Sequence, residues 1–287
     1  MTRIVYVNGR YVPYAEAAVH AEDRGFQFAD AVYEVCEVRN GALIDETRHM
    51  ARLGRSLAAL GIRAPMSDAA LAHVMRQTIR RNRVRNGLVY LQVTRGAGPR
   101  DFVFPAEDVL PTIVCLARSI PAGRSDALAA TGIAVKTVPD IRWRRSDLKT
   151  VMLLPACLAR EAARKDGARE AWFLDGDGFV TEGAASNAWI VTDGERLVTR
   201  QADSGILAGV TRATLMDVLH ADGLALEERP FRLEEALRAR EAFITSATNG
   251  VMPVVKIDGR AIADGTPGPI SRRLRLCFHH IAESLPA

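Results

Sequence analysis

The sequence has no long hydrophobic run and few cysteines. No uninterrupted apolar stretch approaches the roughly 20 residues that a membrane-spanning helix needs, and the first residues alternate as in a strand, without the apolar core of a signal peptide. The four cysteines are far apart and show no paired spacing typical of zinc sites or disulfide frameworks. We therefore expect a cytoplasmic protein without a metal site, whose cysteines are small buried hydrophobes.

Lysine is scarce as well, because only four of the 38 basic residues are lysines and the others are arginines. The position of each lysine therefore needs an explanation. The most basic stretch, residues 76–85, holds five arginines. No aromatic residues or recognised nucleic-acid motif accompany it, so we interpret it as the solvated end of a helix and expect no nucleic-acid partner.

The length and the pattern of the chain predict two domains of mixed structure. At 287 residues the chain is too long for one ordinary core. Residues 119–132 are polar and rich in turn formers, which makes them the best linker between an N-terminal domain, 1–118, and a C-terminal domain, 133–287. Strands and helices alternate irregularly in both halves, which indicates an α+β fold.

Local signals support this reading in the first half. Alternating residues at the start meet Asn8-Gly9, which is a strong hairpin signal, and residues 31–38 alternate as a second strand. Apolar residues then recur at helical spacing over residues 50–60, and Ser67 is a plausible N-cap for the next helix.

Lys149 differs from the other three lysines. Lys165 lies at a helix end, while Lys136 and Lys256 fit outward positions of strands. Lys149 lies between a cationic loop, residues 142–147, and an apolar helical segment that begins at about residue 151. Nearby cations and partial desolvation favour the neutral amine that a Schiff base requires. An ordinary surface lysine in a loop is the alternative.

Two further segments could take part in binding or catalysis. Residues 181–187 place Glu182 at a strand end before a turn of small residues, where a carboxylate could keep a pyridine nitrogen protonated; the alternative is a solvated turn glutamate. Residues 205–212 form a glycine-spaced turn that opens a helix, so backbone N–H groups and Thr211 could bind a phosphate, unless Thr211 is an ordinary N-cap. A small-residue run at 245–250 could add donors.

The order and spacing of these segments resemble the class IV aminotransferases, most closely the D-amino acid aminotransferases. Residues 22–30 with 32–35 look like the N-terminal motif of that family, and residues 140–143 followed by 147–149 look like its lysine segment. The resemblance covers nearly the whole chain. It implies the pyridoxal phosphate fold type IV, with a smaller N-terminal α/β sandwich domain, a C-terminal pseudo-barrel domain, and a homodimer.

The resemblance implies a cofactor, pyridoxal 5'-phosphate, and a role for each matching residue. Lys149 would hold the cofactor as a Schiff base and later move a proton, and Glu182 would pair with the pyridine nitrogen. The phosphate would be bound by Arg52, Val210, Thr211, Ser246 and Ala247, with the backbone alone available at Ala247. The substrate would be bound by Tyr33, Arg100 and Thr248.

The loop that holds Arg100 departs from the family pattern. Residues 94–102 resemble the loop that binds the substrate α-carboxylate, a task that suits a bidentate guanidinium. The family pattern has a histidine two residues after the arginine, whereas this chain has Phe102. A solvated loop arginine is the alternative interpretation of Arg100.

The implied reaction is transfer of an amino group from a D-amino acid, such as D-alanine, to a 2-oxo acid, such as 2-oxoglutarate. Three other activities of the same fold stay open: a branched-chain L-amino acid aminotransferase, an (R)-selective amine transaminase and an aminodeoxychorismate lyase. Residues 33–38 favour the D-amino acid branch over the branched-chain one, while Phe102 keeps the amine transaminase in consideration. A binding protein that has the fold without the chemistry is the alternative from another class.

Overall fold

The computed structural model describes residues 3–221 and 223–287, and it divides into two compact units. The first unit takes the chain up to Ala122 together with Leu148–Met152 and Glu283–Ala287, and the second takes Gly123–Asp147 and Leu153–Ala282. The start of the predicted N-terminal domain, Met1 and Thr2, lies outside the described residues.

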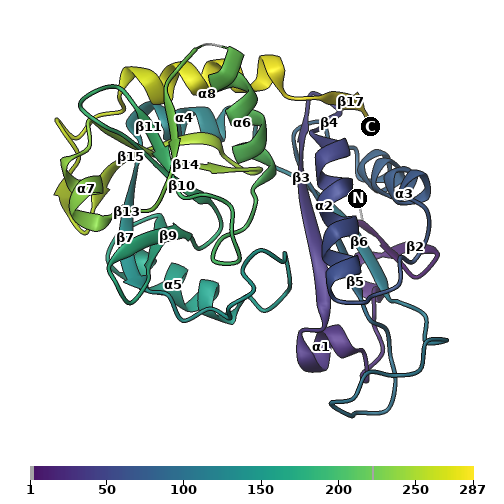
Figure 1. Ribbon diagram of the computed structural model, residues 1–287. Coiled ribbons are helices and arrows are strands. Elements are labelled where there is room, and N and C mark those ends of the chain that lie inside the picture. Colours follow the sequence, from purple (N-terminus) through teal and green to yellow (C-terminus); the bar gives the residue numbers. More distant parts are fainter. Residues whose placement is uncertain (1–2, 222) are drawn as a thin grey trace. The chain divides into compact units, whose positions relative to one another are not determined.

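The first unit is a seven-stranded sheet with helices on one face (Figure 1). The strand order is β17-β4-β3-β5-β6-β1-β2, and every pairing is antiparallel. The strands are β1 (Ile4–Val7), β2 (Arg10–Pro13), β3 (Ala31–Arg39), β4 (Ala42–Ile44), β5 (Gly87–Thr94), β6 (Ile113–Ser119) and β17 (Ser284–Pro286). The helices are η1 (Tyr14–Glu16), α1 (Arg24–Phe28), α2 (Glu46–Ala59) and α3 (Asp68–Arg81).

The local signals of the first unit behave as predicted. The Asn8-Gly9 hairpin is confirmed, because β1 pairs with β2 across these two residues, both of which have positive φ. Ser67 is confirmed as the N-cap of α3, since its hydroxyl accepts from the Ala70 N–H at 3.3 Å. Period-two alternation along β3 turns one set of side chains towards α2 and α3, where the core of this unit forms, and leaves Tyr33 on the opposite face.

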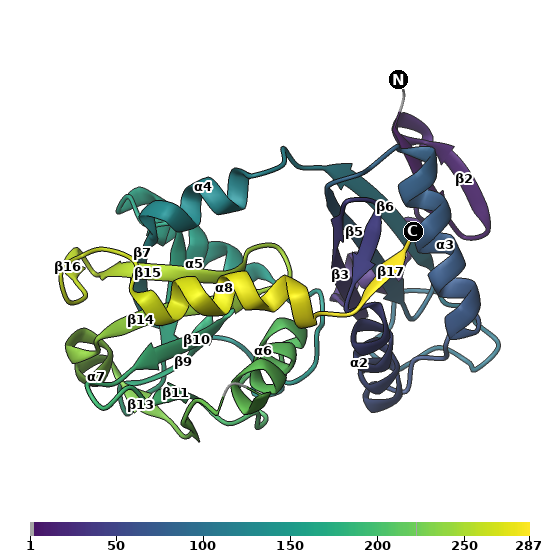
Figure 2. The same ribbon diagram turned by 90° about the horizontal axis from the view of Figure 1, so that it is seen from above.

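The second unit is built on a ten-stranded mixed sheet (Figure 2). Its strand order is β12-β11-β10-β14-β15-β7-β8-β9-β13, with β16 paired to β15. The strands are β7 (Ile133–Pro139), β8 (Glu170–Leu174), β9 (Phe179–Gly183), β10 (Asn187–Val191), β11 (Leu197–Thr199), β12 (Leu226–Glu228), β13 (Phe231–Arg232), β14 (Glu241–Ser246), β15 (Gly250–Ile257) and β16 (Arg260–Ala261). The helices are α4 (Arg124–Thr131), α5 (Leu154–Lys165), α6 (Val210–Ala221), α7 (Leu233–Arg238) and α8 (Pro269–Ile281).

This second sheet is curled. Gly183 at the end of β9 and Ser186 before β10 form an isolated bridge, and the Gly183 N–H donates to the Ser186 carbonyl at 2.7 Å. Trp172 and Phe231 pack edge to face in its core. With 30% helix and 31% strand, the chain is α+β, as the sequence predicted.

The structure changes three expectations. Part of the predicted linker, 119–132, is the helix α4 of the second unit. The helix expected from about residue 151 begins at Leu154, because residues 148–152 run alongside β3 instead. The expectation that all cysteines are buried is wrong, since Cys157 is exposed on α5 and Cys277 is half-buried on α8.

Candidate active site

The predicted site residues lie in both units, and each group has its own internal geometry. In the first unit Lys149 belongs to the segment that runs alongside β3. The Tyr33 N–H donates to the Lys149 carbonyl at 3.0 Å, and the Lys149 Nζ atom lies 3.2 Å from the Tyr33 hydroxyl and 4.3 Å from the centre of its ring. The structure therefore brings together the amine and the tyrosine that the sequence singled out.

Tyr33 is supported from the neighbouring strand. The ring of Tyr90 on β5 stacks on Tyr33 with centroids 5.4 Å apart, and the Tyr90 hydroxyl donates to the Gln92 Oε1 atom at 2.6 Å. Burial raises the pKa of Tyr90 above its ordinary value, so the phenol keeps its proton for this bond. Tyr90 was not predicted as a site residue. Alternation predicts its strand, but only the register of β3 and β5 in the structure places it on the same face as Tyr33.

Arg52, which the resemblance assigned to the phosphate, is anchored by a buried carboxylate. Its Nε and Nη2 atoms donate to the two oxygens of Glu34 at 2.8 and 2.7 Å, and the His49 Nδ1 atom lies 2.7 Å from Glu34 Oε2. Burial works against the ionised form of Glu34, but the charge and hydrogen bonds of Arg52, with those of His49, lower the pKa of Glu34 to about 2. Glu34 and His49 were missed, although a glutamate on the core-facing side of a strand was a visible signal.

Arg100 lies among aromatic rings in the loop between β5 and β6. Its guanidinium carbon is 5.2 Å from the centre of the Phe28 ring and 5.9 Å from that of Phe102, which is 81% exposed. The Asp30 carboxylate accepts from both Arg24 and Arg95, each at 2.8 Å, beside this loop. Arg100 is thus presented next to an apolar ring rather than a second hydrogen-bond donor.

In the second unit Glu182 is not a solvated turn residue, because it is only 5% exposed. One oxygen accepts from the Arg142 Nη1 atom and the other from the Asn187 Nδ2 atom at 3.1 Å, while the Leu207 N–H lies 3.2 Å from both. Four donor contacts hold this carboxylate in one orientation. That arrangement suits an acid that must face a ring nitrogen.

The start of α6 provides the second part of this group. Val210 and Thr211 are buried at its first two positions, where N–H groups and the helix dipole favour an anion. A Cβ atom on Gly209 would lie 2.1 Å from the Asn187 Oδ1 atom, so a larger residue there would displace the side chain that also holds Glu182.

The turn after β14 is polar. The Ser246 and Thr248 hydroxyls are 3.4 Å apart, and the Asn249 side chain donates to Ser246 Oγ at 3.2 Å. The first unit therefore provides the amine of Lys149, and the second provides the carboxylate of Glu182 and donors for a phosphate. These are the groups that pyridoxal phosphate requires.

Comparisons with known proteins decide the family. The pattern of the amino-transferase class IV family matches residues 31–257. The chain belongs to this family. It is 36% identical to a D-alanine aminotransferase of Staphylococcus haemolyticus over 98% of both chains, and 37% identical to one of Bacillus licheniformis over 96% of both. It is therefore a pyridoxal phosphate-dependent aminotransferase.

Solved structures show the same fold. A branched-chain amino acid aminotransferase of Escherichia coli superposes with a TM-score of 0.87 at 22% identity, covering 98% of this chain and 95% of the other. A hypothetical aminotransferase from Mycobacterium tuberculosis in its PLP-bound form gives a TM-score of 0.83 at 22% identity, over 97% and 98% of the two chains. The fold class predicted from the sequence is confirmed.

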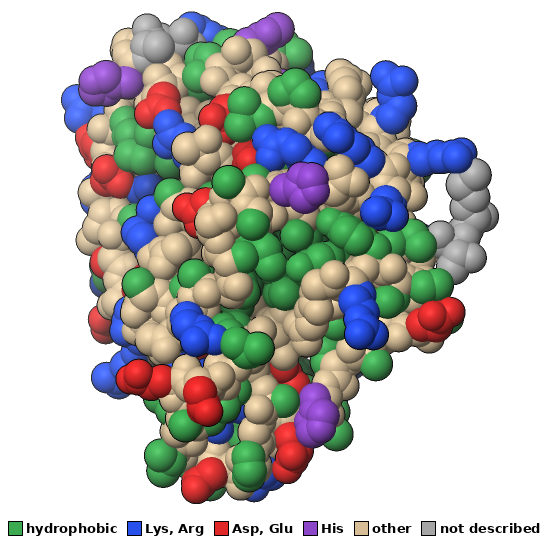
Figure 3. Space-filling model, turned by 90° about the vertical axis from the view of Figure 1, so that its right-hand side faces the viewer, with side chains coloured by type: hydrophobic (Ala, Val, Ile, Leu, Met, Phe, Trp, Pro, Cys, Tyr) green, Lys and Arg blue, Asp and Glu red, His purple; other side chains and the backbone are tan. Residues whose placement is uncertain are grey.

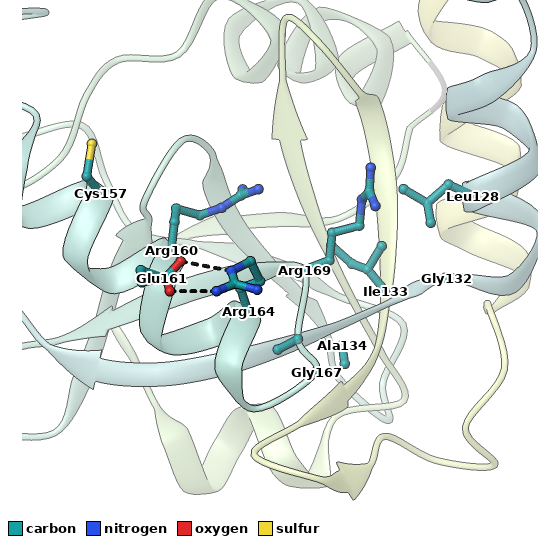
Figure 4. A pocket seen from close by; sticks show the side chains of 11 residues that line it. Leu128, Gly132, Ile133, Ala134, Cys157, Arg160, Glu161, Arg164, Gly167 and Arg169 are labelled. Carbon is teal, nitrogen blue, oxygen red and sulfur yellow. Dashed lines mark hydrogen bonds and ion pairs between the residues drawn. The ribbon is translucent and has the colours of Figure 1, made fainter.

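The aminotransferase also has a cavity of about 800 Å³ in its second unit (Figure 4). It is lined by Leu128, Ile133, Cys157, Arg160, Arg164 and Arg169, among others, and by none of the predicted site residues. Arg160 pairs with the buried Glu170 at 3.1 Å and Arg164 with Glu161 at 2.7 Å, so these two charges are already neutralised. Among residues 3–221 and 223–287, no cluster of His, Cys, Asp and Glu could hold a metal ion, and no helix is long and apolar enough to cross a membrane.

Proposed function

We propose that this aminotransferase transfers an amino group from a D-amino acid, such as D-alanine, to a 2-oxo acid, such as 2-oxoglutarate. One observation carries the proposal: the Lys149 amine lies 3.2 Å from the Tyr33 hydroxyl in a chain whose full-length relatives at 36–37% identity are D-alanine aminotransferases. Amino acids and 2-oxo acids would be its small-molecule partners, it would act in the cytoplasm, and the working form would be a homodimer.

Lys149 would hold pyridoxal 5'-phosphate as a Schiff base, with Glu182 at the ring nitrogen. Arg52, the N–H groups of Val210 and Thr211, Ser246 and the backbone of Ala247 would bind the phosphate. The bound cofactor supplies an electron sink for the substrate Cα. Lys149 would move the proton between the substrate Cα and the C4' carbon of the cofactor, as a general base and then a general acid, and the Tyr33 hydroxyl would orient that amine.

Tyr33, Arg100 and Thr248 would contact the substrate. A guanidinium binds a carboxylate with two parallel hydrogen bonds, so Arg100 would receive the α-carboxylate. The neighbouring Phe102 has no donor to add to this contact. An apolar ring beside Arg100 also favours a second candidate function, an (R)-selective amine transaminase, whose donor has no carboxylate.

The first experiment tests Lys149. Purified protein should be yellow and should bleach with D-alanine, and Lys149→Ala should abolish both the colour and turnover. Borohydride reduction followed by peptide mapping should place the label on Lys149. Lys165→Ala, at the exposed end of α5, is the matched control and should behave as wild type. A fully active Lys149→Ala variant would refute the assignment.

The second experiment separates the activities. Initial rates with D-alanine, L-leucine and (R)-1-phenylethylamine are compared at one fixed 2-oxoglutarate concentration. We expect D-alanine to have the highest kcat/KM. A strong preference for L-leucine would identify a branched-chain enzyme. A preference for (R)-1-phenylethylamine would identify an amine transaminase, in which Phe102 excludes a substrate carboxylate.

A further inference from the structure

We propose that Arg142 is a positioning residue that holds the Glu182 carboxylate ionised and in one orientation for the ring nitrogen of the cofactor. The inference deepens the proposed function, because it rests on the role given there to Glu182. Arg142 lies in the second unit, in the segment between β7 and Lys149, and its side chain is 13% exposed.

The guanidinium of Arg142 bridges two carboxylates. Its Nη1 atom donates to Glu182 Oε1, while Nη2 and Nε donate to the two oxygens of Asp140 at 2.7 and 2.9 Å. Burial disfavours the charged guanidinium, but the hydrogen bonds to Asp140 and the charge of Glu182 raise the pKa of Arg142 above its ordinary value. A permanently protonated arginine is therefore fixed against Glu182.

The same guanidinium ties three chain segments together. Its Nη2 atom lies 3.3 Å from the Thr181 hydroxyl in the middle of β9 and 3.1 Å from the Gly205 carbonyl in the turn before α6. The Thr181 hydroxyl in turn donates to Asp140 at 2.8 Å. The turn fixed at Gly205 is the one whose Leu207 N–H contacts both oxygens of Glu182. Arg142 therefore acts on Glu182 both directly and through the backbone.

Asn187 completes the arrangement from the other side. Its Nδ2 atom bridges Glu182 Oε2 at 3.1 Å and the Leu207 carbonyl at 2.9 Å. Asn187 is neutral, so it holds the Glu182 carboxylate in place without compensating its charge. The Arg142 guanidinium both restricts rotation of the carboxylate and compensates its charge.

The charge of Arg142 determines whether Glu182 or the ring nitrogen of the cofactor would hold the proton between them. Glu182 has little contact with solvent, and burial alone favours a neutral carboxylic acid. A neutral acid opposite a pyridine would leave the ring nitrogen without its proton and weaken the electron sink. An adjacent guanidinium favours the ionised carboxylate, so the proton stays on the nitrogen.

The test uses full-length protein freed of cofactor and two ligands, pyridoxal phosphate and its 1-deaza analogue, which has carbon in place of the ring nitrogen. Both ligands have the same aldehyde and phosphate, so only the contact with Glu182 differs. We expect Arg142→Met to weaken pyridoxal phosphate binding by about 10- to 100-fold, the loss of a hydrogen bond to a charged group, and to weaken binding of the deaza analogue far less. Dissociation constants are measured by quenching of tryptophan fluorescence.

Two variants control this measurement. Arg145→Met changes an exposed arginine of the same loop that pairs with the half-buried Asp147, and it should leave both constants unchanged. Arg142→Lys keeps the charge without the two-sided fork, and it should recover most of the selectivity for pyridoxal phosphate. If Arg142→Met does not fold, the ratio of the two constants in Arg142→Lys and wild type carries the test.

The outcomes separate this inference from the proposed function. Wild-type protein that binds neither ligand would refute the cofactor site as a whole. If wild-type protein prefers pyridoxal phosphate and Arg142→Met weakens the binding of both ligands by the same factor, or of neither, the site is intact and the role of Arg142 is refuted. If Arg142→Met weakens the binding of pyridoxal phosphate more than that of the analogue, the role of Arg142 is supported.

Discussion

Arginine–carboxylate pairs dominate the chemistry of this protein at the scale of single residues. Glu34 is held by Arg52, Asp30 by Arg24 and Arg95, and Glu182 by Arg142. The planar guanidinium stays charged when buried and binds a carboxylate with two parallel bonds, which a lysine cannot do. Several of the many arginines are therefore explained by the carboxylates that they bind. Lys149 differs from them because it contacts the phenol of Tyr33.

Glu34→Gln should strongly destabilise the first unit. The variant keeps the shape of the side chain but leaves Arg52, which is 5% exposed, without its buried counter-charge. Removing one member of a buried pair costs about 3–5 kcal/mol of the free energy of unfolding. Urea unfolding monitored by circular dichroism measures it. Glu161→Gln, which removes the exposed partner of Arg164 on α5, is the control and should change little.

The contribution of Glu34 should also depend on pH. Its pKa falls from an ordinary 4.5 in the unfolded chain to about 2 in the folded one, so the ionised pair stabilises the fold above pH 4.5. This stabilisation is lost progressively as the pH falls towards 2. The difference in free energy of unfolding between wild type and Glu34→Gln should be largest near neutral pH and shrink below pH 4.5. A difference that stays constant down to pH 3 would contradict the assignment.

At the scale of elements, the turn before α6 depends on one glycine. Gly209→Ala would place a methyl group 2.1 Å from Asn187 Oδ1, so that the side chain or the turn must move. Because Asn187 also holds Glu182, we expect weaker pyridoxal phosphate binding, by about tenfold for one lost hydrogen bond to a charged group. Fluorescence titration measures it.

Gly54 provides the matched control for that substitution. It lies on the exposed side of α2, and a Cβ atom there meets nothing within 4 Å. Gly54→Ala should therefore leave cofactor binding unchanged and raise the free energy of unfolding by about 0.5–1 kcal/mol, because alanine is the better helix former. Equal cofactor affinities in Gly209→Ala and wild type would show that the turn tolerates the methyl group.

The N-terminus of α3 offers a simpler test at the same scale. The Ser67 hydroxyl accepts from the Ala70 N–H, and Ser67→Ala leaves that donor without its cap. We expect a loss of about 1 kcal/mol in the free energy of unfolding. Ser67→Asp, which retains an acceptor, should behave close to wild type in the same urea titration, and a similar loss in both variants would argue against capping as the cause.

The elements also show which features sequence patterns can predict. Alternation and Asn-Gly pairs act over a few residues, so β1, β2 and β3 were predictable from them. The segment 148–152 was not, because its pairing with β3 depends on contacts more than 100 residues apart in the chain. The pairing of Arg142 with Glu182, 40 residues apart in the chain, was also missed. The arginine looked like one of several cations in a loop, and only the folded second unit shows which carboxylate it contacts.

At the scale of the whole molecule, the predicted residues are divided between two units. Lys149 lies in the five residues, Leu148–Met152, that the first unit takes from a stretch of chain otherwise belonging to the second. Glu182 and the start of α6 belong to the second unit. A cofactor that binds to residues of either unit would stabilise the folded form of that unit by mass action.

Cofactor binding should accordingly raise the thermal stability of the whole chain. A ligand present at 100 times its Kd adds about 2.7 kcal/mol to the stability of the species that binds it. We expect one unfolding transition at higher temperature with pyridoxal phosphate than without it, measured by scanning calorimetry. Lys149→Ala should lose most of the shift. An equal shift in Lys149→Ala and wild type would instead show that Lys149 does not hold the cofactor.

The first unit exposes several large apolar side chains. Phe26, Phe102, Val103, Phe104 and Leu110 are between 61% and 81% exposed. Figure 3 shows that hydrophobic side chains also gather near the middle of one face of the molecule. Monomeric proteins rarely expose large apolar patches. If these residues contact a second copy of the chain, the 31.3 kDa protein should have twice that mass by light scattering.

Val103→Asp tests this dimer, because a charge at the centre of an apolar contact costs several kcal/mol when it is buried without a partner. We expect the variant to dissociate at lower dilution than wild type and to lose activity as it does so. Leu276→Asp changes a residue of α8 that is 72% exposed, and it is the control that should keep the wild-type mass. A monomeric wild type with full activity would contradict the homodimer, and the exposed apolar residues would then need a different binding partner.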